Sequence, residues 1–237
     1  DLSSTLVLTP ISNYQAPLKG HPPARTDVVF TQTSEGPYAG MRFRLGVHEL
    51  LDPSAGYPNN SHLQVPTVEA GVLLDTNTVI LKRLTLFHLL QMPPSGPGYK
   101  RTGFRLSADI HRDQIRTEDP SLVFDFRFAK GPRLNLADAK LTAYLMPSSI
   151  FSLGSAYTHF GELGLGAEAG LIVGIVDRAR LFLTAESHYY FPMEQHFTTV
   201  KGQGRVHLTR RLSLGVEGQW TGPKTPLSWQ LDLGWLH

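Results

Sequence analysis

The stretch from Leu227 to Trp235 reads Leu-Ser-Trp-Gln-Leu-Asp-Leu-Gly-Trp, and large apolar residues occupy every second position in it. Successive side chains of a β-strand point to opposite sides, so this spacing predicts a strand with one apolar and one polar face. The preceding stretch, 212–220, repeats the pattern with Leu212, Leu214 and Val216. The C-terminal part of the chain is therefore predicted to be two long neighbouring strands.

The same alternation recurs toward the N-terminus, and the segments between the alternating runs are rich in Gly, Pro, Asp and Ser. The further predicted strands are 25–33, 41–48, 62–75, 77–91, 104–111, 122–128, 137–145, 163–175, 179–190 and 200–208. Turn residues lie at 34–37, 75–77, 177–178 and 221–223. No helical periodicity interrupts the series, so we expect about twelve antiparallel strands, most of them roughly 10–14 residues long.

Two all-β architectures fit such a series. A soluble sandwich or barrel has strands that average about 5–6 residues and places the apolar face inside. A transmembrane up-and-down β-barrel needs about 9–11 residues per strand, turns its apolar face to lipid and keeps its polar face in the lumen. The strand lengths favour the barrel, as do aromatic residues near strand ends such as Trp220, Trp229 and Trp235. We expect an outer-membrane barrel over 23–237 and a periplasmic lead-in segment over 1–22.

Composition excludes several other classes of protein. The net charge is +2, from 22 Lys and Arg against 20 Asp and Glu, too balanced for a dedicated nucleic-acid binder. No apolar run reaches the roughly 18 residues of a transmembrane helix. With 0 Cys the chain has no disulfide, no thiolate metal site and no Cys nucleophile. We expect neither a cofactor nor a metal ion.

An even number of strands would place both chain termini on the periplasmic side of a bacterial outer membrane. On that basis the connections 49–61 and 92–100 are predicted to be periplasmic, and 147–160 extracellular. His88 is expected to face lipid near an interface.

The most irregular polar stretch is 44–57, Arg-Leu-Gly-Val-His-Glu-Leu-Leu-Asp-Pro-Ser-Ala-Gly-Tyr. His48-Glu49 does not begin a zinc-peptidase motif, because Asp52 stands where the second His is required. Asp52-Pro53 instead predicts a turn in which the Asp carboxylate holds backbone N–H groups. An ordered inter-strand loop is the first interpretation of this stretch, and a binding or catalytic site is the second.

This stretch resembles a motif in the C-terminal barrel region of a Gram-negative envelope family. Members of that family also carry a periplasmic domain related to the N-terminal domain of the lipoprotein N-acyltransferase Lnb, which is similar to papain-like thiol enzymes. The residues that match the motif are Arg44, His48, Glu49, Leu50, Leu51, Asp52, Pro53, Gly56 and Tyr57, with His21 and Arg25 upstream. Val47 departs from the pattern, in which an aromatic residue more often precedes the His. The thiol domain is not part of this sequence.

The resemblance implies a barrel that anchors or regulates a periplasmic partner domain or subunit. The motif residues, apart from Leu50 and Leu51, are then candidates for a partner-docking or structural loop. Outer-membrane lipid is the other expected partner, and nucleic acid is not expected.

Polar residues recur on the faces predicted to line the lumen. They are Arg105, Asp109, His111, Glu186, His188, Arg205 and His207. Buried charges need partners, so we expect a charge-paired network that largely plugs the lumen.

A pore, or a hydrolase that modifies outer-membrane lipids with a Ser–His–acid set, remains an alternative, and whether the chain is an enzyme stays open. Ser187 is not expected to serve His188, because adjacent strand residues face opposite sides. Glycines at 164–170 are expected to make room for bulky lumen side chains.

Overall fold

The computed structural model describes residues 24–33, 35–45, 48–52, 60–92, 102–113, 121–136, 140–155, 157, 161–222 and 227–237. These residues form thirteen strands and no helix. The strands are β1 (Arg25–Thr33), β2 (Gly36–Arg44), β3 (Ser61–Gln64), β4 (Thr67–Leu73), β5 (Thr78–Gln91), β6 (Thr102–Asp113), β7 (Ser121–Leu136), β8 (Leu141–Leu153), β9 (Gly161–Val176), β10 (Ala179–Phe191), β11 (Gln195–His207), β12 (Leu212–Thr221) and β13 (Ser228–Leu236). In the described part of the chain, no helix could cross a membrane.

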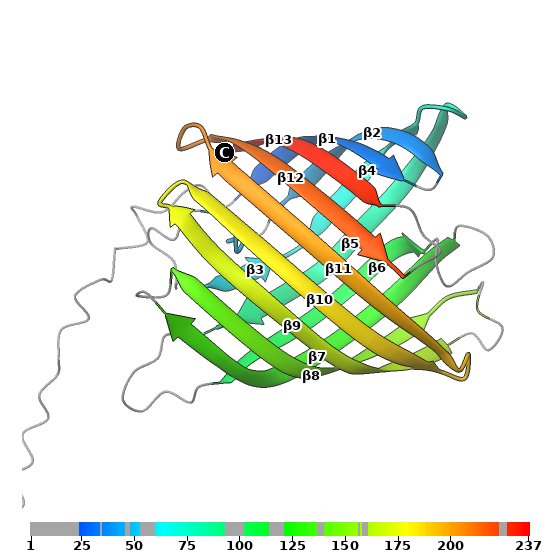
Figure 1. Cartoon of the computed structure of the whole chain (residues 1–237). Coiled ribbons are helices and arrows are strands. Elements are labelled where there is room, and N and C mark those ends of the chain that lie inside the picture. The colour runs from blue at the N-terminus through cyan, green and yellow to red at the C-terminus, as the bar shows by residue number, and fades with distance from the viewer. Residues whose placement is uncertain are drawn as a thin grey trace, which may run out of the picture.

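The strands close into one antiparallel barrel (Figure 1). From β5 to β13 each strand pairs with the next in the chain, and β13 pairs back onto β1, which pairs with β2. β2 pairs with β4, and both β3 and β4 pair with β5, which closes the ring. β3 and β4 follow each other along the same side of β5, with Ser61 opposite Gln91 and Thr67 opposite Thr85. They are two halves of one interrupted strand, and the barrel is therefore twelve-stranded, as the sequence predicts.

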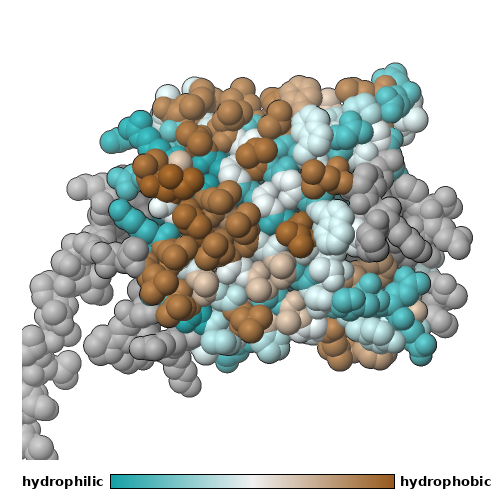
Figure 2. Space-filling view, in the orientation of Figure 1, coloured by the Kyte–Doolittle hydropathy of each residue, from teal (hydrophilic) through white to brown (hydrophobic). Residues whose placement is uncertain are grey.

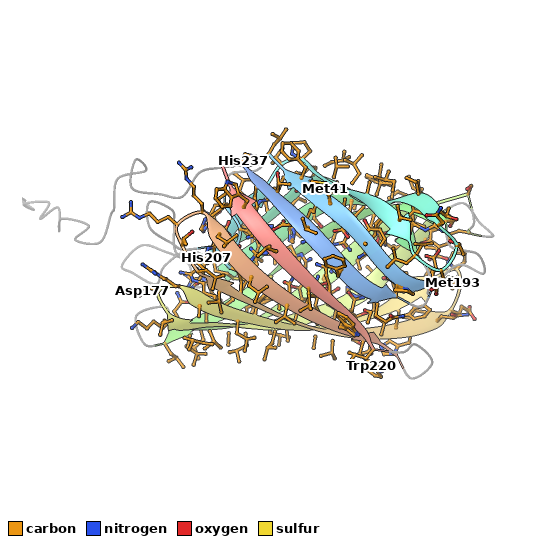
Figure 3. All side chains as sticks on the ribbon, turned by 90° about the horizontal axis from the view of Figure 1, so that it is seen from above. Met41, Asp177, Met193, His207, Trp220 and His237 are labelled. Carbon is orange, nitrogen blue, oxygen red and sulfur yellow. The ribbon has the colours of Figure 1, made fainter. Side chains whose placement is uncertain are left out.

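The alternation in the sequence sets which face of each strand meets the lumen. In β13, Leu231 and Leu233 point outward and are 44% and 48% exposed, whereas Gln230 and Asp232 point inward and are each only 5% exposed. Apolar side chains gather over the outer face (Figure 2), and Met41 and Trp220 extend away from the wall (Figure 3). The outside of the barrel is thus apolar and the inside polar, the reverse of a soluble β-sandwich.

Three parts of the predicted strand pattern are wrong. The alternation predicts a strand over 41–48, but β2 begins at Gly36 and ends at Arg44. Residues 129–136 continue β7 rather than connecting two strands, and β8 extends to Leu153, so the predicted loop 147–160 shrinks to 154–160. Alternation alone does not mark a boundary when a connection such as 137–140 continues it.

His88 points into the lumen rather than toward lipid. β5 has two register shifts, one against β4 at Lys82 and one against β6 between Thr85 and Phe87. Each shift moves the later side chains of β5 to the other face, so simple alternation cannot be followed along this strand. His88 consequently lies against His62, with ring centroids 4.3 Å apart.

Both described ends of the chain lie at one end of the barrel, where Ala24 and His237 hydrogen-bond through their backbones. The connections 45–60, 92–101, 137–140, 177–178 and 208–211 lie at this end, and we call it the terminal end. Apart from the break at 65–66 between β3 and β4, the remaining connections lie at the opposite end. Asp177 and Met193 mark the two ends in Figure 3. The predicted lead-in segment 1–22 lies outside the described residues.

Two glycines of β9 permit close packing inside the barrel. A Cβ atom on Gly170 would lie 2.3 Å from the Tyr144 ring, and one on Gly164 would lie 2.8 Å from the Tyr190 ring. Each ring therefore lies flat over the backbone of β9. The prediction that these glycines make room for bulky lumen residues is confirmed.

Candidate functional site

Residues 48–52, which follow β2, lie inside the barrel at the terminal end and cross its lumen; we call them the plug segment. His48 forms two backbone hydrogen bonds with Leu63 of β3, of 3.0 and 2.7 Å. Leu50 N–H donates to His62 Nδ1 of β3 (3.2 Å), and Leu50 C=O accepts from Arg180 Nη1 of β10 (3.1 Å). β10 lies six strands from the β3–β4 position in either direction around the ring. One residue therefore connects opposite walls.

Asp52 is the centre of a buried ionic network on one side of the plug segment. Its side chain has no exposed surface and contacts Arg44 Nη2 at 3.0 Å, Arg205 Nη1 at 3.3 Å and Arg25 Nη1 at 3.4 Å. Glu49 pairs with Arg44 at 2.6 Å and also with Arg205. Asp52 Oδ2 accepts from the Glu49 N–H at 3.0 Å, within the turn that precedes it. The turn predicted to follow Asp52-Pro53 lies outside the described residues.

The three arginines also determine the ionisation of the plug segment's carboxyl groups. Burial by itself would raise the pKa of Glu49, but Arg205, Arg44 and Arg25 outweigh it and hold that pKa well below the usual value. Burial would likewise raise the pKa of Asp52, and Arg44 and Arg205 lower it below its usual range. Both groups are therefore ionised at neutral pH, and the network is held together by charge.

Strands β1, β11 and β13 complete the network. Arg25 pairs with Asp27 and, at 3.0 Å, with Asp232, and His207 Nε2 lies 3.2 Å from the carbonyl oxygen of Leu51. Sequence reasoning did not assign Asp27 and Asp232 to the site. Their inward positions in alternating strands mark them as lumen residues, but the pattern gives no reason to place β1 and β13 beside the 44–57 motif.

The other side of the plug segment is apolar. Leu50 is buried in a cluster with residues from β5 to β9 and the residue after β5. Its members are Leu50, Leu90, Met92, Ala129, Tyr144, Met146 and Ile172, and Phe182 packs against them. Asn60, at the other end of the connection, donates to Thr142 of β8 at 2.7 Å. An ionic half and an apolar half thus fill the lumen at this level.

Beyond the plug segment, toward the opposite end, the lumen widens into a cavity of about 430 Å³. We call it the cup; Glu49, Leu50 and Leu51 are among its lining residues. Its walls carry paired charges whose lysines are more exposed than the arginines of the plug network: Lys201 pairs with Glu217 at 2.8 Å and Lys82 with Glu69 at 3.0 Å.

The predicted lumen residues all point inward, but they separate into three groups. Arg205 and His207 belong to the plug network. Arg105 pairs with Glu168 at 2.7 Å and with Glu186 at 3.6 Å in the middle of the barrel. Closer to the opposite end, Asp109 accepts from Thr85 at 2.6 Å and His111 lies 3.8 Å from Asp125.

One inward pairing was not foreseen. Ser148 Oγ of β8 lies 2.7 Å from His188 Nε2 of β10, because strand order places β8 two strands from β10. Both side chains are buried. As expected, Ser187 points to the other face from His188.

Of the motif residues, Arg25, Arg44, His48, Glu49 and Asp52 lie in the lumen, and the first three and Asp52 are buried. The remaining candidates, His21, Pro53, Gly56 and Tyr57, fall outside the described residues. Across the described ranges, no group of three or more His, Asp or Glu side chains could hold a metal ion.

A closed barrel with an apolar exterior and a polar interior defines a transmembrane β-barrel, and single-chain barrels with an even number of strands belong to the bacterial outer membrane. The protein is accordingly a bacterial outer-membrane β-barrel. Residues 14–237 match the family described as Domain of unknown function (DUF7840), and the chain belongs to that family.

The chain is similar to solved structures of outer-membrane proteins. The KdgM porin, in complex with disordered oligogalacturonate, is 8% identical over 89% of this chain and 98% of the porin, with a TM-score of 0.50. OmpT, an outer-membrane protein of Vibrio cholerae, is 8% identical over 89% of this chain and 94% of its own, with a TM-score of 0.43. A comparison with curated proteins found no match.

Proposed function

We propose that this chain is a closed outer-membrane anchor that holds a periplasmic partner domain or subunit at its terminal end. The observation that carries the proposal is the plug segment, in which Leu50 hydrogen-bonds to opposite walls while Asp52 joins three buried arginines. A conducting pore needs a continuous aqueous path, whereas here an ionic network and an apolar cluster share the cross-section. The resemblance of the 44–57 motif to the envelope family is the reason to expect a periplasmic domain or subunit as the partner.

A pore is the alternative function, and the cup gives it some support because it is polar and about 430 Å³ in volume. The two functions differ in conductance. We expect the purified barrel to show no steady channel in planar bilayers at neutral pH. Stable ion conductance by the wild-type chain, without prior treatment with acid or denaturant, would contradict the closed anchor.

Orientation is the second requirement, because an anchor for a periplasmic partner must turn its terminal end to the periplasm. The chain has 0 Cys, so single cysteines can be introduced without background. Thr76→Cys lies in the turn between β4 and β5 at the opposite end, and Asp177→Cys lies in the turn between β9 and β10 at the terminal end. In intact cells a membrane-impermeant maleimide should label Thr76→Cys alone. Labelling of Asp177→Cys before permeabilisation would exclude this orientation.

The same two variants test for a partner. A cysteine-directed cross-linker on Asp177→Cys should yield one discrete adduct, or an intramolecular link to a preceding domain if the natural chain carries one. Thr76→Cys is the matched control and should yield neither. If the Asp177→Cys barrel is correctly oriented but forms no cross-link, no partner is bound at the terminal end. That result would overturn the proposal.

A further inference from the structure

A second Ser–His pair lies on the outside of the barrel. Ser187 Oγ of β10 is 2.6 Å from His196 Nε2 of β11. Ser187 is paired with Ala167 on one side and with Thr198 on the other, all on the outward face. This pair therefore faces the membrane, in contrast to the buried Ser148–His188 pair in the lumen.

The depth of the outward pair matches the position of lipid ester groups. Tyr189 and Phe191, the next two outward residues of β10, pack edge to face with centroids 4.7 Å apart. Such aromatic girdles mark the boundary between the hydrocarbon and the polar headgroups. Ser187 lies one outward position further into the bilayer than Tyr189. Ester carbonyls that join acyl chains to a lipid headgroup lie at this boundary.

Small residues lead from the pair along the outer wall toward the middle of the membrane. Ala185 follows Ser187 on β10, and Gly202 and Gly218 lie opposite each other on β11 and β12. A Cβ atom on Gly218 would meet nothing within 4 Å, so the space outside the wall is open there. Further along β10 and β11, a hollow of about 210 Å³ lies around Leu181 and Gly204.

The length of this track suits one acyl chain. Thr198, beside Ser187, and Gly204 are six residues apart on β11, which is about 20 Å along a strand. With the strands tilted by about 45°, that distance covers about 14 Å of depth, close to half of a hydrocarbon core about 30 Å thick. A lipid whose ester carbonyl lies at Ser187 could place its chain along the track within a single leaflet.

We propose that Ser187 and His196 form a lipid-facing esterase site that releases an acyl chain from a membrane lipid. Ser187 Oγ attacks the ester carbonyl carbon while His196 Nε2 takes the hydroxyl proton. The carbon–oxygen bond to the lipid breaks, and the leaving alkoxide receives that proton from His196. Water then hydrolyses the acyl-serine with His196 again as base, giving a fatty acid and restoring Ser187. The net reaction consumes one water molecule, and no redox partner is involved.

Thr198 is positioned to assist this reaction. Its Oγ1 is 3.2 Å from Ser187 Oγ and lies on the same outward face. A hydroxyl beside the attacking oxygen can donate a hydrogen bond to the negative charge that develops on the former carbonyl oxygen. The site thus supplies a nucleophile, a base and one donor, and its substrate class is an ester-linked acyl lipid.

A fluorophosphonate probe tests the nucleophile directly, because it forms a covalent adduct with activated serines. The folded barrel in vesicles of phosphatidylethanolamine and phosphatidylglycerol should be labelled on Ser187. Ser187→Ala should abolish labelling, and His196→Gln should slow it about a hundredfold, the scale of a lost general base. Ser148→Ala is the matched control and should label like the wild type. Heat-modifiable migration verifies that each variant is folded.

Release of fatty acid measures the reaction itself. One arm uses the phospholipid vesicles alone and the other adds lipopolysaccharide, so the two arms distinguish a phospholipid from a lipid A ester. Thr198→Val should lower the rate about a hundredfold while leaving the barrel folded. The proposal would be overturned if the folded wild-type barrel is not labelled, or if the Ser187→Ala variant is labelled as strongly as the wild type. It would also be overturned if the wild-type barrel releases fatty acid in neither arm. These results do not depend on the anchor role, which is tested by conductance and cross-linking.

Discussion

The two halves of the lumen are built from the same strands but are filled differently. Arg205 and Lys201 lie four residues apart on the inward face of β11. The Arg205 side chain is 4% exposed and contacts Glu49 and Asp52, whereas Lys201 is 24% exposed and pairs with Glu217. The plug segment makes the difference, since it covers the terminal half and leaves the cup open. The alternating strands supply a polar wall, and the inserted segment decides whether that wall is buried.

Arg205→Met should give the largest effect. The plug network has three arginines, Arg25, Arg44 and Arg205, against four carboxylates, Asp27, Glu49, Asp52 and Asp232. Removing one arginine leaves buried carboxylates short of partners, which costs about 3–5 kcal/mol. We expect that loss in urea unfolding of the purified barrel, together with channel openings in planar bilayers. A variant as stable and as closed as the wild type would show that the network does not hold the plug segment.

Leu50→Ala should rank second. Leu50 is 2% exposed within the apolar half of the plug. Truncating a buried Leu costs about 2–5 kcal/mol, from lost burial and the cavity that remains. Leu214→Ala on the lipid-facing side is the control, and lipid can fill the space there. Equal unfolding free energies for the two variants would mean that Leu50 is not packed as described.

Acid should open the plugged half of the lumen. A carboxyl group with a depressed folded-state pKa contributes its full stabilisation above its ordinary pKa and loses it as pH falls through the folded value. The ordinary values for Glu49 and Asp52 are 4.5 and 3.8, and both pKa values are lowered here. Bilayer conductance should therefore stay absent from neutral pH down to about pH 5 and appear only below about pH 4. Opening between pH 6 and 7 would point to a different titrating group.

Lys201→Met should give the smallest effect. The Lys201–Glu217 pair is partly exposed, and such pairs contribute about 0–1 kcal/mol. We expect an unfolding free energy within that range of the wild type and a barrel that stays closed. Added salt should reduce the difference further. A loss comparable with that of Arg205→Met would abolish the distinction between the two halves.

Much of the barrel could be predicted from local pattern. β1 begins and ends where the alternation indicates, and β9, β10, β12 and β13 agree within a few residues. Side chains alternate between the two faces of a regular strand, so the position of a residue along the strand decides which face it occupies. The outward Leu231 and the inward Asp232 could therefore be predicted from the sequence. The pattern misled in β5, where two register shifts interrupt the alternation before His88. It also misled at β7–β8, because the alternation continues through the connection between these strands.

Less of the candidate site could be predicted from the sequence. The 44–57 motif identified Arg44, Glu49 and Asp52 as unusual, but not that they meet Arg205 and Asp232. The Ser148–His188 and Ser187–His196 contacts are similar cases. Each requires the register between strands, which turn geometry, bulges and ring closure set together.

The sequence by itself determined the class of molecule, because a spacing of two fixes which residues face lipid and which face the lumen. Tertiary structure decided what fills the lumen. Residues 48–52 fold back into the barrel because three arginines from β1, β2 and β11 converge there, and buried positive charge requires carboxylate partners. That convergence exists only once β13 has paired with β1 and the ring has closed.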